Sequence, residues 1–214
     1  MTNDKKRLSN IAFSKDAPDY DRSPKYSTLR ESYPKIRNEA LVKPFRTVLD
    51  IGCGTGALLR MIREKRKDAL LFGIDLSEQM IQVALPRLGE NADLRVSDSE
   101  KLPFASESFD LVTCTFSFHR YPNPGNVLLE MRRVLAPSGR LLLADPSPPM
   151  PLRQVMNFVH LFTKDGTVRI YPKKEMKALI ETAGLQFIKW EKLNWHSCLF
   201  VAVKKSWVLD TETI

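Results

Sequence analysis

The sequence contains few of the residues that build metal centres and disulfide frameworks. Cysteine occurs three times, at Cys53, Cys114 and Cys198, and no two cysteines form a C-x-x-C pair. We therefore expect neither a metal site nor a disulfide, and we expect the thiols to be small buried side chains. Histidine also occurs only three times, and no Ser/His/Asp or metal-spaced cluster is present.

Long hydrophobic runs are also missing. No apolar segment approaches the length that spans a bilayer, and the basic residues in 1–7 are not followed by the apolar segment of a secretory signal. We therefore expect a cytoplasmic protein without membrane insertion. The net charge is +8, but the basic residues are spread along the chain, and their dense run at 60–67 falls on an expected helix. Such runs usually face water, so we do not expect nucleic acid as a partner.

Segments of strand length alternate with segments of helical periodicity in this chain of 214 residues, which is typical of one α/β domain. The expected strands cover residues 47–51, 69–75, 94–96, 109–116, 140–145, 187–193 and 198–203. Repeated β-α units predict a Rossmann-like, mostly parallel sheet with helices on both faces. Residues 194–196 are too short a connection for a helix, so the last two strands should be antiparallel partners.

A glycine-rich turn follows the first expected strand. Gly52, Gly54 and Gly56 let the backbone adopt unusual dihedral angles and let a ligand approach the main chain closely. Together with Ala57, the first two also match the G-x-G-x-x-G/A spacing of dinucleotide sites, which leaves a nicotinamide oxidoreductase as an alternative. Asp50 argues against a pyrophosphate there, because like charges about 4 Å apart cost roughly 1 kcal/mol even in water.

Two further acids stand at expected strand ends. Asp75 ends the second strand, where a carboxylate can accept both hydroxyls of a ribose. Asp98 follows the third strand, where it can accept a hydrogen bond from an exocyclic amine such as that of adenine. Parallel strands present their carboxyl ends at one edge of a sheet, so these acids and Asp50 describe a pocket for a cationic nucleoside. S-adenosylmethionine has the required ammonium, sulfonium, ribose and adenine.

Four segments resemble the successive motifs of class I S-adenosylmethionine-dependent methyltransferases: DIGCGTG at 50–56, GIDLSEQM at 73–80, DSEKLPF at 98–104 and SFDLV at 108–112. The sequence is most similar to the small-molecule branch that includes the quinone-biosynthesis C-methyltransferases. This resemblance implies a seven-stranded sheet of order 3-2-1-4-5-7-6 with the last strand antiparallel. It also implies S-adenosylmethionine as cofactor and transfer of its methyl group to an unidentified small-molecule acceptor by in-line displacement.

The resemblance also implies roles for individual residues. Asp50 would lie beneath the methionine ammonium, Asp75 would bind the ribose hydroxyls, and Asp98 would accept from the adenine amine. The other predicted cofactor contacts are Tyr20, Gly52, Cys53, Gly54, Gly56, Leu76, Met80, Ser99 and Thr115.

His119 is the candidate catalytic residue, because it follows the fourth expected strand beside the expected position of the methyl group. An unperturbed histidine pKa of about 6.5 suits a general base at neutral pH, if the acceptor must lose a proton. A loop histidine that only packs or hydrogen-bonds is an equally open interpretation.

We expect one methyltransferase domain at 13–205 between a flexible polar leader, 1–12, and a tail, 206–214. By the resemblance, segment 13–46 covers the cofactor mouth. The proline-rich segment 146–170 is a possible acceptor-site region, and its helical apolar spacing predicts a lid or, slightly favoured, a packed helix. An RNA or protein methyltransferase and a non-catalytic cofactor-binding protein remain alternatives, and the oligomeric state is open.

Overall fold

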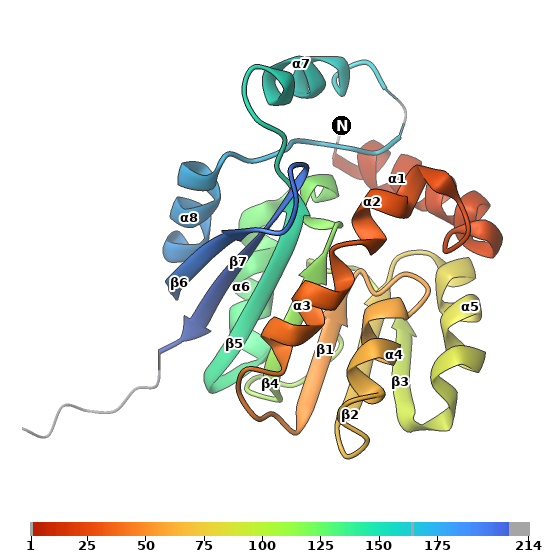
Figure 1. Cartoon of the computed structure of the whole chain (residues 1–214), viewed down its shortest axis with the longest axis vertical. Helices are drawn as coiled ribbons and strands as arrows, with labels where there is room; N and C mark the ends of the chain where they lie inside the picture. Colours follow the sequence, from red (N-terminus) through yellow and green to blue (C-terminus); the bar gives the residue numbers. More distant parts are fainter. Residues whose placement is uncertain (1, 164, 206–214) are drawn as a thin grey trace, which may run out of the picture.

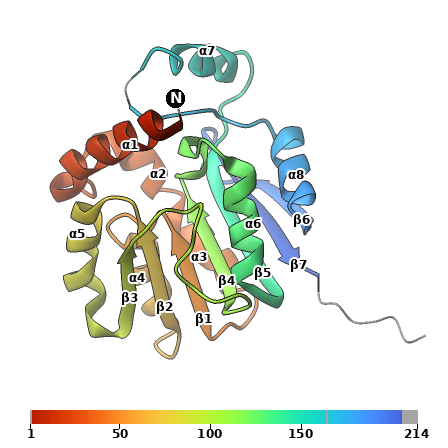
Figure 2. The same ribbon diagram turned by 180° about the vertical axis from the view of Figure 1, so that it is seen from behind.

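The computed structural model describes residues 2–163 and 165–205, so the expected tail at 206–214 lies outside the described residues. Within these residues, seven strands form one sheet in the order β3-β2-β1-β4-β5-β7-β6, with helices against both faces (Figures 1 and 2). β7 runs antiparallel to β5 and β6, and the other pairs are parallel. The predicted fold class is confirmed.

Strands and helices alternate through most of the chain, as the hydrophobic periodicity predicts. The strands are β1 (Thr47–Ile51), β2 (Leu70–Asp75), β3 (Ala92–Val96), β4 (Phe109–Thr115), β5 (Leu135–Pro146), β6 (Leu185–Lys192) and β7 (Ser197–Lys204). The α-helices are α1 (Thr2–Asp16), α2 (Ser27–Arg30), α3 (Tyr33–Ala40), α4 (Ala57–Arg63), α5 (Glu78–Leu88), α6 (Pro124–Val134), α7 (Leu152–Val159) and α8 (Lys173–Thr182). A 3-10 turn, η4 (Phe118–Arg120), follows β4.

The central strands are apolar on both faces, because both faces are covered. Val48 and Leu111 pack with residues of α3, α4 and α5, whereas Leu49 and Val112 pack with residues of α6 and α8. Successive side chains of a strand point to opposite faces, so a doubly covered sheet requires an uninterrupted apolar run. The core therefore forms two layers, and the carboxyl ends of β1, β2 and β4 meet at one edge of the sheet.

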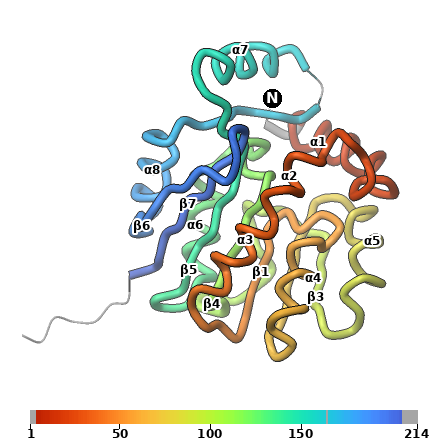
Figure 3. Tube along the Cα trace, viewed as in Figure 1, coloured from red at the N-terminus to blue at the C-terminus, as the bar shows by residue number. Residues whose placement is uncertain are grey.

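The N-terminal segment departs from the expected flexible leader. Its described part belongs to α1, which lies across the carboxyl edge of the sheet (Figure 3). Lys6 Nζ lies 2.7 Å from a carboxylate oxygen of Asp98 and 2.7 Å from one of Glu100. Ser14 Oγ shares a 2.8 Å hydrogen bond with Ser77 Oγ. Polar contacts with distant parts of the chain hold this helix, and local hydrophobic periodicity does not report them.

α7 also differs from the favoured interpretation, because it is not packed into the core. None of its residues is buried, and the helix stands apart from the body at one end of the molecule (Figure 1). Side-chain hydrogen bonds hold it: Asn157 of α7 exchanges two hydrogen bonds with the backbone of Ile170, at 3.0 and 2.8 Å. Lys5 Nζ donates to the carbonyl of His160 at 3.0 Å.

Candidate functional site

A cavity opens at the carboxyl edge of the sheet, where the glycine turn, the loop after β4 and the N-terminal helices meet. Including its open mouth, it encloses about 860 Å³. Its wall contains most of the predicted cofactor contacts: Tyr20, Gly52, Cys53, Gly54, Asp75, Leu76, Met80, Asp98, Ser99 and Thr115. Among the described residues, the wall does not include Asp50, Gly56 or His119.

The glycine turn joins β1 to α4, and its glycines have different roles. Gly54 has a φ of +53°, and a Cβ there would meet no atom closer than 4.0 Å, so its backbone faces open space. Gly52 has a φ of +75°, and a Cβ there would lie 2.6 Å from Ser117 Oγ. Gly56 precedes α4 with a φ of +73°, and a Cβ would lie 2.8 Å from Leu88. Gly54 therefore allows close approach of a ligand, while Gly56 lets α4 pack against α5.

Asp75 presents its carboxylate to the cavity from the end of β2. Its Oδ2 accepts from the backbone N–H of Gly54 at 2.9 Å, and its Oδ1 accepts from that of Ser77 at 2.9 Å. Burial raises the pKa of Asp75 above its ordinary value, and these backbone donors oppose the rise. A carboxylate offers about four lone-pair sites, so both oxygens can still accept from the hydroxyls of a ligand.

Asp98 reaches the wall with both oxygens already engaged. Lys6 Nζ donates to its Oδ2 at 2.7 Å, and the backbone N–H of Glu100 donates to its Oδ1 at 3.0 Å. Lys6 itself lines the cavity. A lysine from the segment expected to be a flexible leader therefore shares its positive charge between Asp98 and Glu100 at the predicted adenine end.

Asp50 lies directly behind the wall. It is 1% exposed, and its Oδ1 accepts from Thr113 Oγ1 at 2.7 Å. Burial raises the pKa of Asp50 to about 7, the hydrogen bond from Thr113 opposes this rise, and the charge of Asp75 adds to it. A nearby cation favours the ionised form of such a carboxylate, so Asp50 can respond to a positive charge in the cavity. Its predicted place beneath the methionine ammonium stays a prediction.

His119 is buried beside the cavity and has a carboxylate partner that the sequence did not identify. Its Nδ1 lies 2.8 Å from Oδ1 of Asp145, which is on β5. Within the part of the chain that the structure describes, Nε2 has no hydrogen-bond partner. The carbonyl of His119 accepts from the backbone N–H groups of Val168 and Arg169 at 2.9 and 3.0 Å. This residue therefore ties the loop after β4 to the segment after α7, and its role as a base stays a prediction.

In the described part of the chain, Arg120 places a buried guanidinium without a direct ion-pair partner in the cavity wall. Its guanidinium carbon lies 4.4 Å from the ring centroid of Phe13, and Nη1 donates to the carbonyl of Asp165 at 2.6 Å. Its Nε is buried without a hydrogen-bond partner, and no carboxylate among the described residues forms an ion pair with it. Burial lowers the pKa of Arg120. A buried guanidinium with free donors attracts an anionic oxygen.

Two tyrosines add further donors to the same wall. Tyr20 and Tyr33 both line the cavity, and neither hydroxyl has a hydrogen-bond partner among residues 2–163 and 165–205. Burial raises the pKa of both phenols, so their hydroxyls stay protonated. Together with Arg120 they form what we call the donor cluster.

Sequence reasoning missed several wall residues, namely Lys6, Ser9, Thr55, Ile74, Ser97, Phe116, Ser117, Arg120 and Tyr121. The last four, Phe116, Ser117, Arg120 and Tyr121, could have been predicted, because they follow a central parallel strand at the edge where α/β sheets bind ligands. Phe116 has a φ of +55°, and strained backbone of this kind concentrates at functional sites. Within the described residues, segment 146–170 contributes nothing to the wall.

The wall fits S-adenosylmethionine better than a dinucleotide. Asp75 lines the cavity and can accept further hydrogen bonds, and Asp50 is buried with its charge coupled to that of Asp75. Two carboxylates at this turn repel a pyrophosphate and attract an ammonium or sulfonium. The open backbone at Gly54 leaves room for the ligand between them.

Other kinds of site find no support in the described residues. Among them, no group of three or more His, Cys, Asp or Glu side chains is arranged to hold a metal ion. Cys53, Cys114 and Cys198 are free and buried. No helix in the described ranges is both long and apolar enough to cross a membrane.

Known proteins share both the sequence and the fold. A family model for the methyltransferase domain matches residues 49–143. The ubiquinone/menaquinone biosynthesis C-methyltransferase UbiE of Paraburkholderia phytofirmans is 32% identical over 179 residues, covering 73% of this chain and 74% of that protein. The demethylmenaquinone methyltransferase of Thermotoga maritima is 37% identical over 102 residues, covering 48% of this chain and 44% of that protein.

Among solved structures, a Burkholderia thailandensis 1,6-didemethyltoxoflavin-N1-methyltransferase, with bound 1,6-didemethyltoxoflavin and S-adenosylhomocysteine, has the same fold. Its TM-score is 0.75 at 17% identity, covering 96% of this chain and 91% of that chain.

The order of the strands, the residues of the cavity wall and the sequence similarity all indicate the same protein family. The predicted enzyme class and cofactor are confirmed, and the nicotinamide oxidoreductase is rejected. The chain therefore belongs to the S-adenosylmethionine-dependent methyltransferase family that includes the ubiquinone/menaquinone biosynthesis C-methyltransferases.

Proposed function

We propose that this methyltransferase acts on a small hydroxylated aromatic acceptor, whose ionised oxygen is held by the donor cluster. The observation that carries this proposal is the buried guanidinium of Arg120, which has no ion-pair partner among the described residues and shares the cavity wall with the free hydroxyls of Tyr20 and Tyr33. The names of the relatives support it, since ubiquinone and menaquinone have hydroxylated rings in their reduced form. A phenolate would satisfy the buried charge, whereas a neutral acceptor would leave it uncompensated.

The cofactor would occupy the part of the cavity next to the glycine turn. In this proposal Asp75 accepts from both ribose hydroxyls, the backbone of Gly54 contacts the ligand directly, and Leu76 and Met80 flank the adenine. Asp50 would stabilise the ammonium from behind the wall. The other predicted contacts in the wall are Gly52, Cys53, Ser99 and Thr115. Asp98 would bind the adenine amine while it keeps its ion pair with Lys6.

The acceptor would lie at the opposite end, below segment 13–46. Phe13, Tyr20 and Tyr33 of that segment line the cavity, and Arg120 reaches it from the loop after β4. These residues would hold the acceptor oxygen so that the ring carbon next to it faces the methyl group. Such positioning can supply roughly 7 to 11 kcal/mol of the barrier reduction.

The chemistry at the acceptor follows from charge balance. Removal of the phenolic proton places negative charge on the oxygen, where Arg120 stabilises it, and this raises the electron density of the neighbouring ring carbon. That carbon forms the new bond to the methyl group as the bond from methyl to sulfur breaks. The ring carbon then releases its own proton to the solvent, which restores aromaticity. S-adenosylmethionine supplies the activated methyl group.

His119 is our candidate for the base that removes the phenolic proton. Asp145 would fix the tautomer with the proton on Nδ1 and leave Nε2 as the acceptor. Replacement with glutamine should then lower kcat by about 100-fold or more. A His119→Gln protein that turns over at the wild-type rate would rule out the base.

Arg120→Gln tests the acceptor site. The assay follows transfer of a labelled methyl group from S-adenosylmethionine to reduced demethylmenaquinone, and calorimetry gives the affinity for S-adenosylhomocysteine. Because one charge-assisted hydrogen bond is lost, kcat/KM should fall by about 10- to 100-fold while the affinity stays constant. The matched control is Arg22→Gln, which replaces an exposed arginine paired with Asp19.

Three outcomes would contradict this proposal. An unchanged kcat/KM in Arg120→Gln would remove the acceptor role. A parallel loss of S-adenosylhomocysteine affinity would assign the guanidinium to the carboxylate of the cofactor. If the wild-type protein binds S-adenosylhomocysteine but methylates no phenolic compound, the proposed acceptor class is wrong.

A further inference from the structure

The segment at residues 150–162, which carries α7, exposes an unusual concentration of large apolar side chains. The exposed fractions are Met150 61%, Leu152 40%, Val155 56%, Phe158 64%, Val159 48%, Leu161 68% and Phe162 74%. We call these residues the α7 patch. Elsewhere among the described residues, exposed side chains of this size occur singly along the sequence. A patch of this kind marks a surface that binds a partner.

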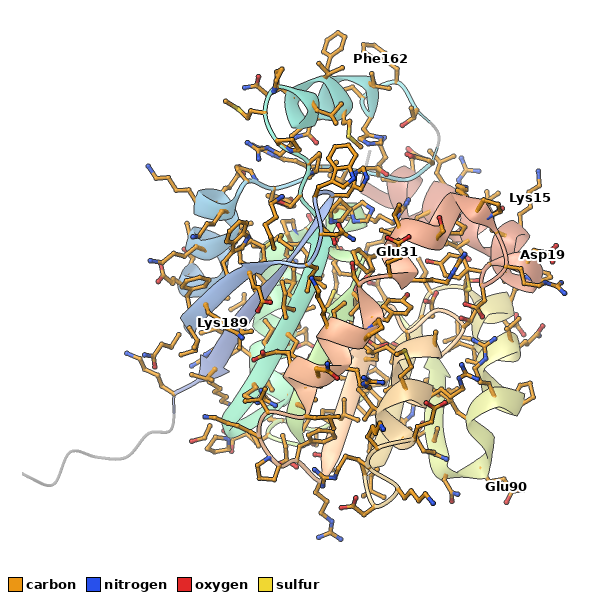
Figure 4. The ribbon with its side chains drawn as sticks, viewed as in Figure 1. Lys15, Asp19, Glu31, Glu90, Phe162 and Lys189 are labelled. Atoms are coloured by element: carbon orange, nitrogen blue, oxygen red, sulfur yellow. The ribbon has the colours of Figure 1, made fainter. Side chains whose placement is uncertain are left out.

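The α7 patch lies at the same end of the molecule as the cavity. α7 and α1 both lie beyond the carboxyl ends of the central strands in both ribbon views (Figures 1 and 2). Phe162 points away from the body (Figure 4). The chain just beyond the patch also contacts the cavity wall, because Arg120 Nη1 donates to the carbonyl of Asp165.

An exposed aromatic residue lies near the base of α7. Trp195 is 62% exposed in the hairpin between β6 and β7. This hairpin adjoins the segment leading to α7, because the backbone N–H of Ser147 donates to the carbonyl of His196. Tryptophan with one exposed face is typical of residues that lie at the boundary between lipid and water.

The segment that carries the α7 patch is basic, although the exposed Asp4 stands next to Lys5 on α1. Residues 146–163 include Arg153 and contain no aspartate or glutamate. Lys5 of α1 adds a second cation at the end of α7, where it donates to the carbonyl of His160. The next acid along the chain, Asp165, already accepts hydrogen bonds from the hydroxyls of Thr163 and Thr167. An apolar helix with cations and no acids complements a membrane of anionic lipids.

We propose that the α7 patch, with Trp195, docks the protein onto the surface of an anionic lipid bilayer. Apolar side chains would enter the boundary between headgroups and acyl chains, and Arg153 and Lys5 would contact the lipid phosphates. Docking would turn the end of the protein that carries the cavity toward the lipid, without any segment crossing the bilayer. This inference does not depend on the proposed acceptor.

Vesicle sedimentation tests the proposal with the full-length protein. The vesicles contain phosphatidylcholine alone or equal parts of phosphatidylcholine and phosphatidylglycerol. We expect the wild-type protein to sediment with the anionic vesicles and high salt to weaken this binding. The variant Phe158→Ser/Phe162→Ser should bind at least about tenfold more weakly, because its apolar contact is reduced. Arg153→Gln should weaken binding by about fivefold.

The matched control is Val42→Ser/Leu129→Ser, which removes two apolar side chains that are 66% and 52% exposed outside the patch. It should bind vesicles like the wild type. Calorimetry with S-adenosylhomocysteine checks that each variant is folded, and this readout also separates failure of docking from failure of the cofactor assignment.

Two results would overturn the proposal. The first is a wild-type protein that stays in the supernatant with both kinds of vesicle at low salt. The second is a concentration-dependent dimer, seen by analytical ultracentrifugation, that the Phe158→Ser/Phe162→Ser variant abolishes. The α7 patch would then be an interface between two copies of the chain.

Discussion

At the residue scale, the buried carboxylates of Asp50 and Asp75 predict that cofactor binding depends on pH. Both carboxylates lie at the glycine turn, and burial raises the pKa of each, that of Asp50 to about 7. Below that value Asp50 is mostly neutral, and above it the carboxylate is charged. A cationic ligand favours the charged form, so the affinity should rise with pH.

Asp50→Asn tests this link. The wild-type affinity for S-adenosylmethionine should increase by about five- to tenfold between pH 6 and pH 8, and the variant should show a much smaller increase. Calorimetry at pH 6 and at pH 8 measures the affinity of the wild-type protein and of the variant. A wild-type affinity that is the same at pH 6 and pH 8 would show that Asp50 does not respond to the cofactor's charge.

The same pKa shift predicts the direction of a stability effect. An unfolded aspartate has a pKa of about 3.9, so the folded protein retains an extra proton on Asp50 between roughly pH 4 and pH 7. The contribution of Asp50 to the free energy of unfolding therefore falls as the pH rises through this window and is constant above it.

Individual residues also show how far the sequence could predict the site. The place of Asp75 in the cavity wall was predictable, because parallel strands present their carboxyl ends at one edge of the sheet. The partners Lys6 and Asp98 are 92 positions apart, and His119 and Asp145 are 26 apart. No local pattern records such pairs, since they exist only once the sheet has brought the strand ends together.

At the scale of secondary-structure elements, apolar periodicity was sufficient to predict the strands of the sheet. It did not predict how α1 and α7 contact the rest of the protein. The strands bury both faces, so their sequences are constrained along their whole length. α1 is held by single polar contacts, such as Ser14 with Ser77, and α7 has an apolar face that nothing in the described chain covers. Periodicity predicts an apolar face but not what covers it.

Ser77→Ala tests the connection between α5 and α1. Ser77 caps α5 by accepting from the backbone N–H of Met80 at 3.2 Å, and it also bonds Ser14 of α1. Loss of the cap should reduce the free energy of unfolding by about 1 kcal/mol and lower Tm by roughly 2 to 4 °C. Thermal unfolding measures the shift. The control is Ser106→Ala, at an exposed position, and an equal shift in both variants would contradict the capping role.

At the scale of the whole molecule, one end of the sheet collects the functional features. The glycine turn, the carboxylates, the donor cluster and the α7 patch all lie beyond the carboxyl ends of the strands. Parallel topology explains this concentration, because each β-α connection places a loop at that edge. The opposite end carries the short turns that reverse the chain.

The central claim is that carboxylates at this edge select a cationic, phosphate-free adenosyl compound. Its most direct test is calorimetric titration of S-adenosylhomocysteine and NAD into the wild-type protein, Asp75→Asn and the control Asp93→Asn, which lies outside the cavity wall. We predict that only S-adenosylhomocysteine binds, and that Asp75→Asn weakens it by at least about tenfold while Asp93→Asn does not. Binding of NAD without S-adenosylhomocysteine, or full affinity in Asp75→Asn, would contradict the account.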